Sequence, residues 1–284
     1  MRPGKTEAAE KQWDAVDLAS KLYQRTARVG VIGMGYVGLP TMVAAGEGGF
    51  TVTGIDINEG RVAGINEGKS HIEDVQEETL APLVRAGKIS ATTDFAVLND
   101  LDVVLVCVPT PITEDKDPDL KSMAAAVTDL ANHLRQGQLV VLQSTTYPGT
   151  IEEFVLPTLE KTGLKVGTDF YLAFALERID PGNDQFGMRN VPKVVGGVTS
   201  ECTKVATDFF STFVEQVIPV SSPKVAEMTK LLENTFRSVN IALVNELAML
   251  CQRMEIDIWE VIEAASTKPF GYMPFYPGPG VGGH

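Results

Sequence analysis

A glycine-rich turn between a predicted strand and a predicted helix constrains the fold of this chain more than any other feature. The apolar run 28–32 is followed at once by Gly33-Met34-Gly35-Tyr36-Val37-Gly38, the pattern G-x-G-x-x-G. In such a turn the first glycine permits the tight bend, the second lets the backbone approach a pyrophosphate, and the third lets helix and strand pack closely. Since N–H groups at a helix N-terminus attract phosphate, the turn predicts a dinucleotide site.

An acidic residue closes the second predicted strand, 51–55. Asp56 stands where the acid that binds the adenosine ribose hydroxyls is expected, and its carboxylate would repel a 2′-phosphate. Arg61 follows shortly and is the one feature that favours a phosphate contact. We therefore expect NAD rather than NADP as the cofactor. Its predicted contacts begin with Gly33, Gly35, Tyr36, Val37, Gly38, Asp56 and Arg61.

The remaining pattern predicts an α/β fold. Apolar runs typical of buried strands at 102–108, 138–143, 170–174, 193–195 and 216–220 alternate with helical patterns at 36–47, 61–66, 77–86, 120–135, 151–161 and 199–213. Asp117 or Asp119 is the expected cap of the 120–135 helix. Near-continuous apolar strands alternating with helices indicate a Rossmann doubly wound parallel sheet with helices on both faces.

A long connecting helix and a short all-α segment follow this sheet. Residues 223–254 have no glycine and no internal proline, and their apolar side chains recur at helical spacing. The helix would be about 45 Å long at 1.5 Å per residue. Such helices bridge domains or form subunit interfaces, so we expect a homodimer through it. We predict a leader at 1–27, a dinucleotide-binding domain at 28–221 and a central helical segment at 222–284.

Composition narrows the function classes. The net charge of −13 argues against non-specific nucleic-acid binding, and no run of apolar residues is long enough to span a membrane. The three cysteines, Cys107, Cys202 and Cys251, lack metal-binding spacing, so we expect no metal, no disulfide framework and a cytoplasmic location. Cys107 lies in an apolar run and is read as a buried strand residue rather than a nucleophile.

Two interpretations of residues 1–27 stay open. Trp13, Val16 and residues 18–22 fit one stripe of an amphipathic helix, whereas the mixed charges equally fit a frayed leader. The segment lacks the apolar core of a signal peptide.

From about Arg28 to His284 the chain resembles the UDP-glucose/GDP-mannose dehydrogenase family. The resemblance rests on motifs in the family's order: the glycine-rich turn through Pro40, Asp56-Ile57-Asn58, Val108-Pro109-Thr110-Pro111, Ser144-Thr145, Glu177-Arg178-Ile179-Asp180-Pro181-Gly182, Lys230-Leu231-Leu232-Glu233-Asn234 and Gly278-Pro279-Gly280-Val281-Gly282-Gly283-His284. The last motif, with Lys268-Pro269-Phe270-Gly271 before it, resembles most the bacterial branch that acts on UDP-N-acetylhexosamines.

The resemblance implies a four-electron oxidation of the sugar C6 alcohol to a carboxylate, with two NAD molecules reduced in turn. A cysteine thiolate captures the aldehyde, and a thioester is then hydrolysed. UDP-N-acetylglucosamine is the first choice of substrate, over UDP-N-acetylmannosamine and UDP-glucose. The resemblance extends the cofactor site to Val108, Pro109, Thr110, Ser144 and Thr145.

The same resemblance implies catalytic roles for Thr145, Glu177, Lys230 and Asn234. Lys230 and Asn234 share a helix face, where they would stabilise an oxyanion; the alternative is a solvated face. Glu177, at the carboxyl end of a strand, is assigned to acid–base work on the attacking water, which Thr145 helps to hold. Arg178 either clamps a substrate anion or pairs with Asp180 or Asp184. The substrate residues implied are Glu177, Arg178, Lys230, Asn234, Tyr276 and Gly280.

Two departures from the family pattern matter. The family has Ser-Pro or Asn-Pro before the glutamate, whereas this chain has Ala175-Leu176, which predicts a less constrained loop. The family motif also continues past His284 with the nucleophilic cysteine and a UDP-binding domain, and none of the three cysteines replaces it by position. We therefore expect residues 1–284 to bind NAD and to be inactive alone.

Two alternatives remain open. A β-hydroxyacid or 6-phosphogluconate-type dehydrogenase shares the Rossmann domain, the long helix and a helical lysine, but the Gly-Gly-His ending and the Glu177-to-Gly182 loop argue against it. A non-catalytic NAD-binding module that naturally lacks the nucleophile is the alternative from another class.

Overall fold

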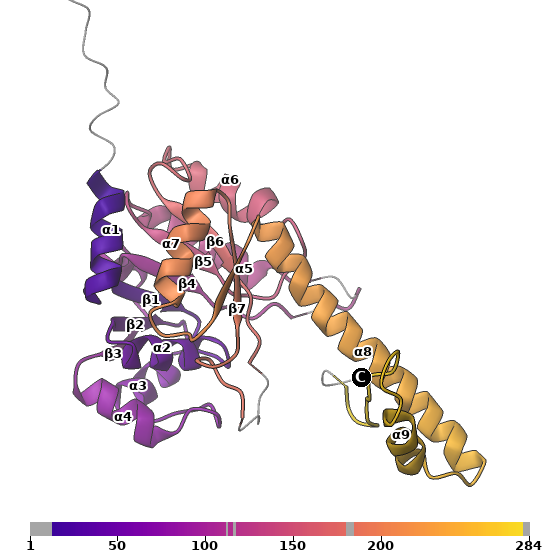
Figure 1. Cartoon of the computed structure of the whole chain (residues 1–284). Coiled ribbons are helices and arrows are strands. Elements are labelled where there is room, and N and C mark those ends of the chain that lie inside the picture. The colour runs from indigo at the N-terminus through magenta and orange to yellow at the C-terminus, as the bar shows by residue number, and fades with distance from the viewer. Residues whose placement is uncertain (1–12, 112, 116–117, 180–184, 281–284) are drawn as a thin grey trace, which may run out of the picture. The chain divides into compact units, whose positions relative to one another are not determined.

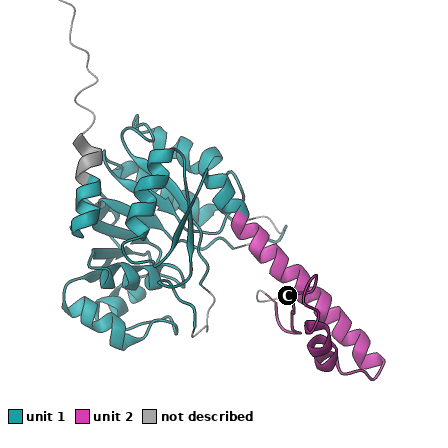
Figure 2. Ribbon diagram, viewed as in Figure 1, with its two compact units in different colours: residues 1–228 teal, residues 229–284 magenta. Residues whose placement is uncertain are grey.

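The computed structural model describes residues 13–111, 113–115, 118–179 and 185–280 (Figure 1). The chain divides into two compact units, residues 1–228 and 229–284 (Figure 2). The helix α8, Pro223–Arg253, begins in the first unit and continues in the second.

The first unit is built on one eight-stranded sheet in the order β3-β2-β1-β4-β5-β6-β7-β8. The strands are β1 Arg28–Ile32, β2 Thr51–Ile55, β3 Ile89–Thr92, β4 Val103–Val106, β5 Leu139–Leu142, β6 Tyr171–Ala175, β7 Lys193–Gly197 and β8 Val217–Val220. The parallel sheet predicted from the sequence is confirmed, and the one exception among these strands is that β7 runs antiparallel to β6. The sequence patterns missed β3, a short strand with only alternate residues buried.

Helices cover both faces of this sheet, as predicted for a doubly wound fold. They are α1 Trp13–Gln24, α2 Gly38–Glu47, α3 Glu59–Asn66, α4 Glu77–Arg85, α5 Lys121–His133, α6 Leu156–Glu160 and α7 Ser200–Phe210, with a 3₁₀ helix η2 at Phe95–Asp100 and a π-helix η3 at Ile151–Val155. Of the two aspartates predicted to cap α5, Asp119 accepts the backbone N–H of Lys121, the first residue of the helix, at 2.9 Å through its Oδ1. The other, Asp117, lies outside the described residues.

Neighbouring residues of one strand enter different cores, which explains the continuous apolar runs. Val103 and Leu105 of β4 belong to the core on one face, and Val104 and Val106 belong to the core on the other. The four residues of β5 alternate in the same way. Since both faces are covered, no position of these strands is left for a polar side chain.

The segment predicted as one helix at 151–161 is instead a π-helix followed by α6. Pro157 lacks the N–H that would bond the carbonyl oxygen of residue 153, and its ring crowds that carbonyl. A wider turn before the proline relieves this crowding.

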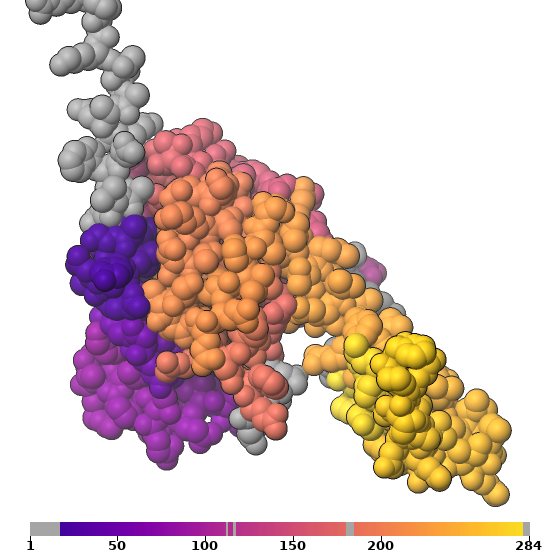
Figure 3. All heavy atoms as spheres, in the orientation of Figure 1, coloured from indigo at the N-terminus to yellow at the C-terminus, as the bar shows by residue number. Residues whose placement is uncertain are grey.

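Helix α1 packs on the first unit through two leucines. Leu18 and Leu22 are buried in the core that also contains α7 residues. Figures 1 and 3 show α1 in indigo beside α7 in orange. The side chains of residues 13–17, and so the predicted Trp13 and Val16, lie outside the description.

The second unit contains the rest of α8, the helix α9 at Ile258–Ser266 and the segment up to residue 280. The Asp257 side chain caps α9 by accepting the N–H of Trp259. The Asn245 side chain binds the backbone of Gly278 twice, at 2.9 and 3.0 Å, which fixes the last segment to α8. In the part of the chain that the structure describes, no helix is long and apolar enough to cross a membrane.

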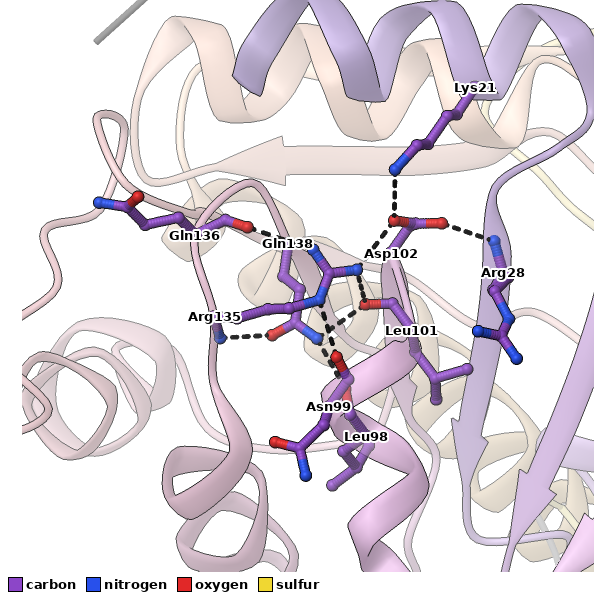
Figure 4. Close-up of polar contacts among 9 residues, drawn as sticks. All are labelled: Lys21, Arg28, Leu98, Asn99, Leu101, Asp102, Arg135, Gln136 and Gln138. Atoms are coloured by element: carbon purple, nitrogen blue, oxygen red, sulfur yellow. Dashed lines mark hydrogen bonds and ion pairs between the residues drawn. The ribbon is translucent and has the colours of Figure 1, made fainter. Parts of the chain in front are cut away.

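A buried carboxylate joins four segments near the amino end of the sheet (Figure 4). Asp102, 5% exposed, accepts the backbone N–H of Arg28 at 2.9 Å, and Oδ1 accepts bonds from Arg135 at 2.8 Å and Lys21 at 3.1 Å. Burial opposes ionisation of Asp102, but the Arg28 N–H and the two cations outweigh it and lower its pKa. The carboxylate thus links α1, β1, β4 and the segment after α5.

We expect Asp102→Asn to destabilise the first unit by about 1–3 kcal/mol near neutral pH, because an amide loses the charge-assisted bonds. The folded-state pKa of Asp102 is lowered, so its stabilisation is present above the ordinary carboxyl pKa and disappears as the pH falls through the folded value. Urea unfolding at neutral and acidic pH measures both effects. Asp100→Asn, at an exposed position, is the matched control. A difference between wild type and Asp102→Asn that is constant with pH would contradict the assignment.

Candidate functional site

A cavity of about 740 Å³ lies at the carboxyl ends of β2, β1, β4 and β5. It is lined by 11 of the predicted cofactor residues, Gly33, Gly35, Tyr36, Val37, Asp56, Arg61, Val108, Pro109, Thr110, Ser144 and Thr145. Because β1 pairs in parallel with both β2 and β4, the ends of these strands meet at one edge. Ligands of open α/β sheets bind in such a crevice.

The glycine-rich turn has the geometry that its sequence predicts. Gly33 has φ of +90°, and a Cβ there would lie 2.8 Å from the Cys107 carbonyl oxygen. A Cβ at Gly38 would collide with the Gly33 carbonyl oxygen, so Gly38 allows helix and strand to approach. A Cβ at Gly35 would meet nothing within 4 Å, which leaves open space beside the backbone on the cavity side. Only Gly38 among the predicted cofactor residues is absent from the cavity lining.

Asp56 holds the turn as well as facing the cavity. Its Oδ2 accepts the N–H of Met34 at 2.9 Å, and its Oδ1 accepts the N–H of Asn58 at 2.9 Å. Arg61 lies 3.5 Å from Oδ2, so its charge is paired with Asp56. The carbonyl oxygen of Met34 lies 2.7 Å from His71 Nε2, a contact that sequence reasoning missed. The Met34 residue is therefore held at both its N–H and its C=O.

The opposite end of the cavity offers polar atoms to a ligand. Within the described residues, Thr110 Oγ1 and Gln143 Nε2 are buried without a hydrogen-bond partner, and both residues line the cavity. The Ser144 hydroxyl donates to the Val108 carbonyl oxygen at 2.8 Å, which joins the ends of β4 and β5. Unpaired buried polar atoms are costly, so this end of the cavity suits a ligand rich in hydroxyl and amide groups, such as the nicotinamide riboside of NAD.

Several lining residues were not predicted from the sequence. Phe95 comes from η2, and Lys121, Ser122, Ala125 and Asp129 come from α5. The helix η2 follows β3 and α5 follows β4, and neither helix carries a sequence motif that marks it as part of a site. Only the packing of these helices on the sheet brings their residues to the cavity.

Cys107 is buried, as its interpretation as a buried strand residue predicts, although it lies one residue beyond the end of β4. Its Sγ lies 3.5 Å from Gln143 Oε1. Burial raises the pKa of the Cys107 thiol far above its ordinary value, and the charge of Glu177 raises it further, while Lys193 acts in the opposite direction. The thiol therefore stays protonated, which disfavours nucleophilic chemistry.

Glu177 is a buried, paired carboxylate at the carboxyl end of β6. Its Oε1 accepts the N–H groups of Arg178 and Ile179 at 2.7 and 2.8 Å, and its Oε2 accepts Lys193 Nζ at 2.9 Å. The side chains of Glu177 and Lys193 are only 8% and 3% exposed. The Lys193 ammonium also lies 5.2 Å from the centre of the Phe210 ring. Glu177 does not line the cavity, but its charge reaches Cys107, which does.

The sequence before Glu177 is restrained without the family's proline. The N–H of Leu176, which a proline would lack, donates to the Val194 carbonyl oxygen at 2.9 Å and extends the β6–β7 pairing. The Arg178 guanidinium donates to the Pro192 carbonyl oxygen at 2.7 Å. The predicted loosening of this segment is therefore wrong as far as Ile179. Asp180 and Asp184, the other predicted partners of Arg178, lie outside the described residues.

The other predicted site residues belong to the second unit. Lys230 and Asn234 lie one helical turn apart on α8, as the spacing predicts. Tyr276 stacks on Trp259, with ring centres 6.0 Å apart. Gly280 has φ of +73°, a conformation that favours glycine. The roles of these residues stay predictions, and the Gly282-Gly283-His284 end of the motif lies outside the described residues.

We expect Lys193→Met to destabilise the first unit by about 3–5 kcal/mol, because it leaves the Glu177 carboxylate buried without its cation. Denaturant unfolding measures this loss. Lys204→Met removes an exposed pair with Asp208 and should change the free energy of unfolding by less than about 1 kcal/mol. The double variant Glu177→Gln/Lys193→Met should recover part of the loss. If Lys193→Met were as stable as Lys204→Met, the Glu177–Lys193 pair would contribute little to the free energy of unfolding.

Comparison with known proteins agrees with this geometry. Residues 27–214 match the NAD-binding domain of the UDP-glucose/GDP-mannose dehydrogenase family, and residues 224–284 match its central domain. The chain is 41% identical over 259 residues to the UDP-N-acetyl-D-glucosamine 6-dehydrogenase of Pseudomonas aeruginosa, which covers 90% of the chain and 60% of the relative. The chain thus spans about 60% of the length of such relatives.

Solved structures give the same result. The UDP-D-ManNAc dehydrogenase of Pyrococcus horikoshii superposes with a TM-score of 0.84 at 37% identity, covering 90% of this chain and 61% of that one. A ternary complex of GDP-mannose dehydrogenase from Pseudomonas aeruginosa superposes with a TM-score of 0.79 at 26% identity, covering 85% of this chain and 57% of that one. The glycine turn, Asp56 and the cavity residues thus lie in the NAD-binding domain of a known family. This chain belongs to the UDP-glucose/GDP-mannose dehydrogenase family.

Proposed function

We propose that the protein containing this chain is an NAD-dependent nucleotide-sugar 6-dehydrogenase that oxidises the C6 hydroxyl of a UDP-sugar to the uronic acid. The observation that carries the proposal is the cavity at the carboxyl edge of the sheet, which joins the glycine turn and Asp56 to Thr110, Ser144 and Thr145. NAD, when bound there, accepts hydride from the substrate. The chain's own residues bind and orient the reactants.

UDP-N-acetylglucosamine is the first choice of substrate. Relatives named for UDP-N-acetyl-D-glucosamine and UDP-N-acetyl-D-mannosamine are 41% and 38% identical to this chain, which supports an N-acetylhexosamine without separating the two. UDP-glucose and UDP-N-acetylmannosamine are the alternative substrates. A non-catalytic NAD-binding module is the alternative of a different class.

Each site residue has a proposed task. The N–H groups of the turn receive the pyrophosphate, and Asp56 binds the adenosine ribose. Glu177 serves in acid–base work on the attacking water, which Thr145 helps to hold. Lys230 and Asn234 stabilise an oxyanion, while Arg178, Tyr276 and Gly280 contact the substrate. The Glu177–Lys193 pair supports this assignment, because it fixes the position of a buried carboxylate at the carboxyl end of β6.

We further propose a homodimer that works in the cytoplasm. Large apolar side chains of α8 are exposed in the isolated chain, among them Leu232, Val239 and Leu243, at 62%, 60% and 57%. Apolar surface on this scale is typical of an interface. Cys107, Cys202 and Cys251 are all free thiols, which fits a reducing compartment.

Titration calorimetry tests the cofactor site. Residues 1–284 should bind NAD, and Asp56→Ala should weaken binding by about tenfold or more, because the ribose hydroxyls and the Met34 N–H both lose an acceptor. Glu59→Ala, on the first turn of α3, is the matched control. The same residues should produce no NADH from UDP-sugars, because none of Cys107, Cys202 and Cys251 stands at the position that the family resemblance implies for the nucleophile. Absence of NAD binding would overturn the cofactor site, and measurable turnover would overturn the inactivity.

Light scattering tests the dimer. The chain should have twice the monomer mass of 30.6 kDa, and Val239→Glu on the exposed face of α8 should shift it to monomer. Lys204→Glu, on α7 of the first unit, should leave the dimer intact. A monomer at high concentration of the unmutated chain would refute the proposal.

A further inference from the structure

Glu227 is a buried carboxyl on the first turns of α8 that bonds to the backbone after β5. It is 1% exposed; its Oε2 accepts the N–H of Gly149 at 2.6 Å and its Oε1 accepts the N–H of Ile151 at 3.1 Å. All three residues belong to the first unit. One carboxyl therefore satisfies two N–H groups at the entrance to η3.

A carboxyl at this position costs free energy. Burial raises the pKa of Glu227 above its ordinary value, although the N–H groups of Gly149 and Ile151 lower it. The nearby Lys224 lies 2.5 Å from a Glu152 oxygen, with which it forms an ion pair. An apolar residue in place of Glu227 would leave two buried N–H groups without acceptors, so the contact fixes the path of the backbone.

The segment that Glu227 holds leads directly into the cavity. Ser144 and Thr145 line the cavity, and the Ser144 hydroxyl is tied to the Val108 carbonyl oxygen. The Thr150 hydroxyl donates to the Tyr147 carbonyl oxygen at 2.7 Å, which folds the segment into a compact turn. Residues 144–150 are thus anchored by β4 at one end and by Glu227 at the other.

This anchored segment lies at one end of the cavity only. The sheet order β2-β1-β4-β5 places Asp56, after β2, at the far end from Ser144 and Thr145, after β5. The adenosine of NAD, which the proposed function places at the Asp56 end, would not contact the segment that Glu227 holds. A substitution of Glu227 should therefore weaken binding of the nicotinamide half of a dinucleotide more than binding of its adenosine half.

We propose that Glu227 is a positioning residue for the nicotinamide half of the cofactor site: it holds the 144–150 turn so that Ser144 and Thr145 face the bound nicotinamide riboside. The proposal rests on the proposed function of the cavity as an NAD site. It assigns Glu227 no contact with cofactor or substrate.

The test compares NAD with ADP-ribose, which lacks the nicotinamide. In titration calorimetry on residues 1–284, Glu227→Gln should weaken NAD binding by about tenfold and ADP-ribose binding by less than about twofold. An amide keeps one acceptor but turns an NH₂ toward the other backbone N–H. Glu152→Gln, which removes the neighbouring half-buried carboxylate, is the matched control and should leave both affinities unchanged.

The ratio of the two affinities separates positioning from a purely structural role. Equal weakening of NAD and ADP-ribose, or no weakening of NAD, would overturn the proposal. If Glu227→Gln does not fold, Glu227→Asp keeps the charge on a shorter arm and should give a smaller loss confined to NAD; equal losses there overturn the proposal too. Failure of the unmutated chain to bind NAD would instead overturn the proposed function itself.

Discussion

The parallel hydrogen-bonded register of β1 between β2 and β4 is the constraint on which the site depends. Ile32 pairs with Ile55 and Val106, so the residues that follow these strands, Gly33, Asp56 and Cys107, emerge at the same level. The cavity is formed at that level. The register is strongly specified because alternate residues of β4 enter opposite cores, and a shift by one residue would exchange them.

Buried charges at both edges of the sheet reinforce this arrangement. At the amino edge, Asp102 joins β1 to the cations of Lys21 and Arg135 (Figure 4). At the carboxyl edge, the Glu177–Lys193 pair ties the end of β6 to the antiparallel β7, and Glu227 ties α8 to the turn after β5. Buried ionic groups cost free energy to desolvate, and each of these groups joins segments that are distant in the sequence.

Predictions from the sequence were correct for features that depend on a particular residue type at a particular place in the chain. The glycine turn, Asp56 and the strand ends at Val108 and Ser144 were predicted and line the cavity together. Predictions failed where a contact joins distant segments with ordinary side chains. Lys193 was seen only as the start of a strand, and its pairing with Glu177 depends on the reversal of β7, which no local pattern records. His71, Phe95 and Glu227 carry no motif of their own.

The sequence by itself determined the fold class, the NAD-binding turn and the family, because glycine conformation, strand hydrophobicity and motif order are local properties of the chain. Only the tertiary structure decided how Glu177 is held without a preceding proline: the Leu176 N–H bonds to β7, and Lys193 neutralises the carboxylate from the same strand. It likewise decided that Glu227 anchors the turn beside Ser144. Buried polar groups need hydrogen-bond partners, and folding brings together groups that are distant in the sequence. The spacing of residues along the chain does not show which of these groups will pair.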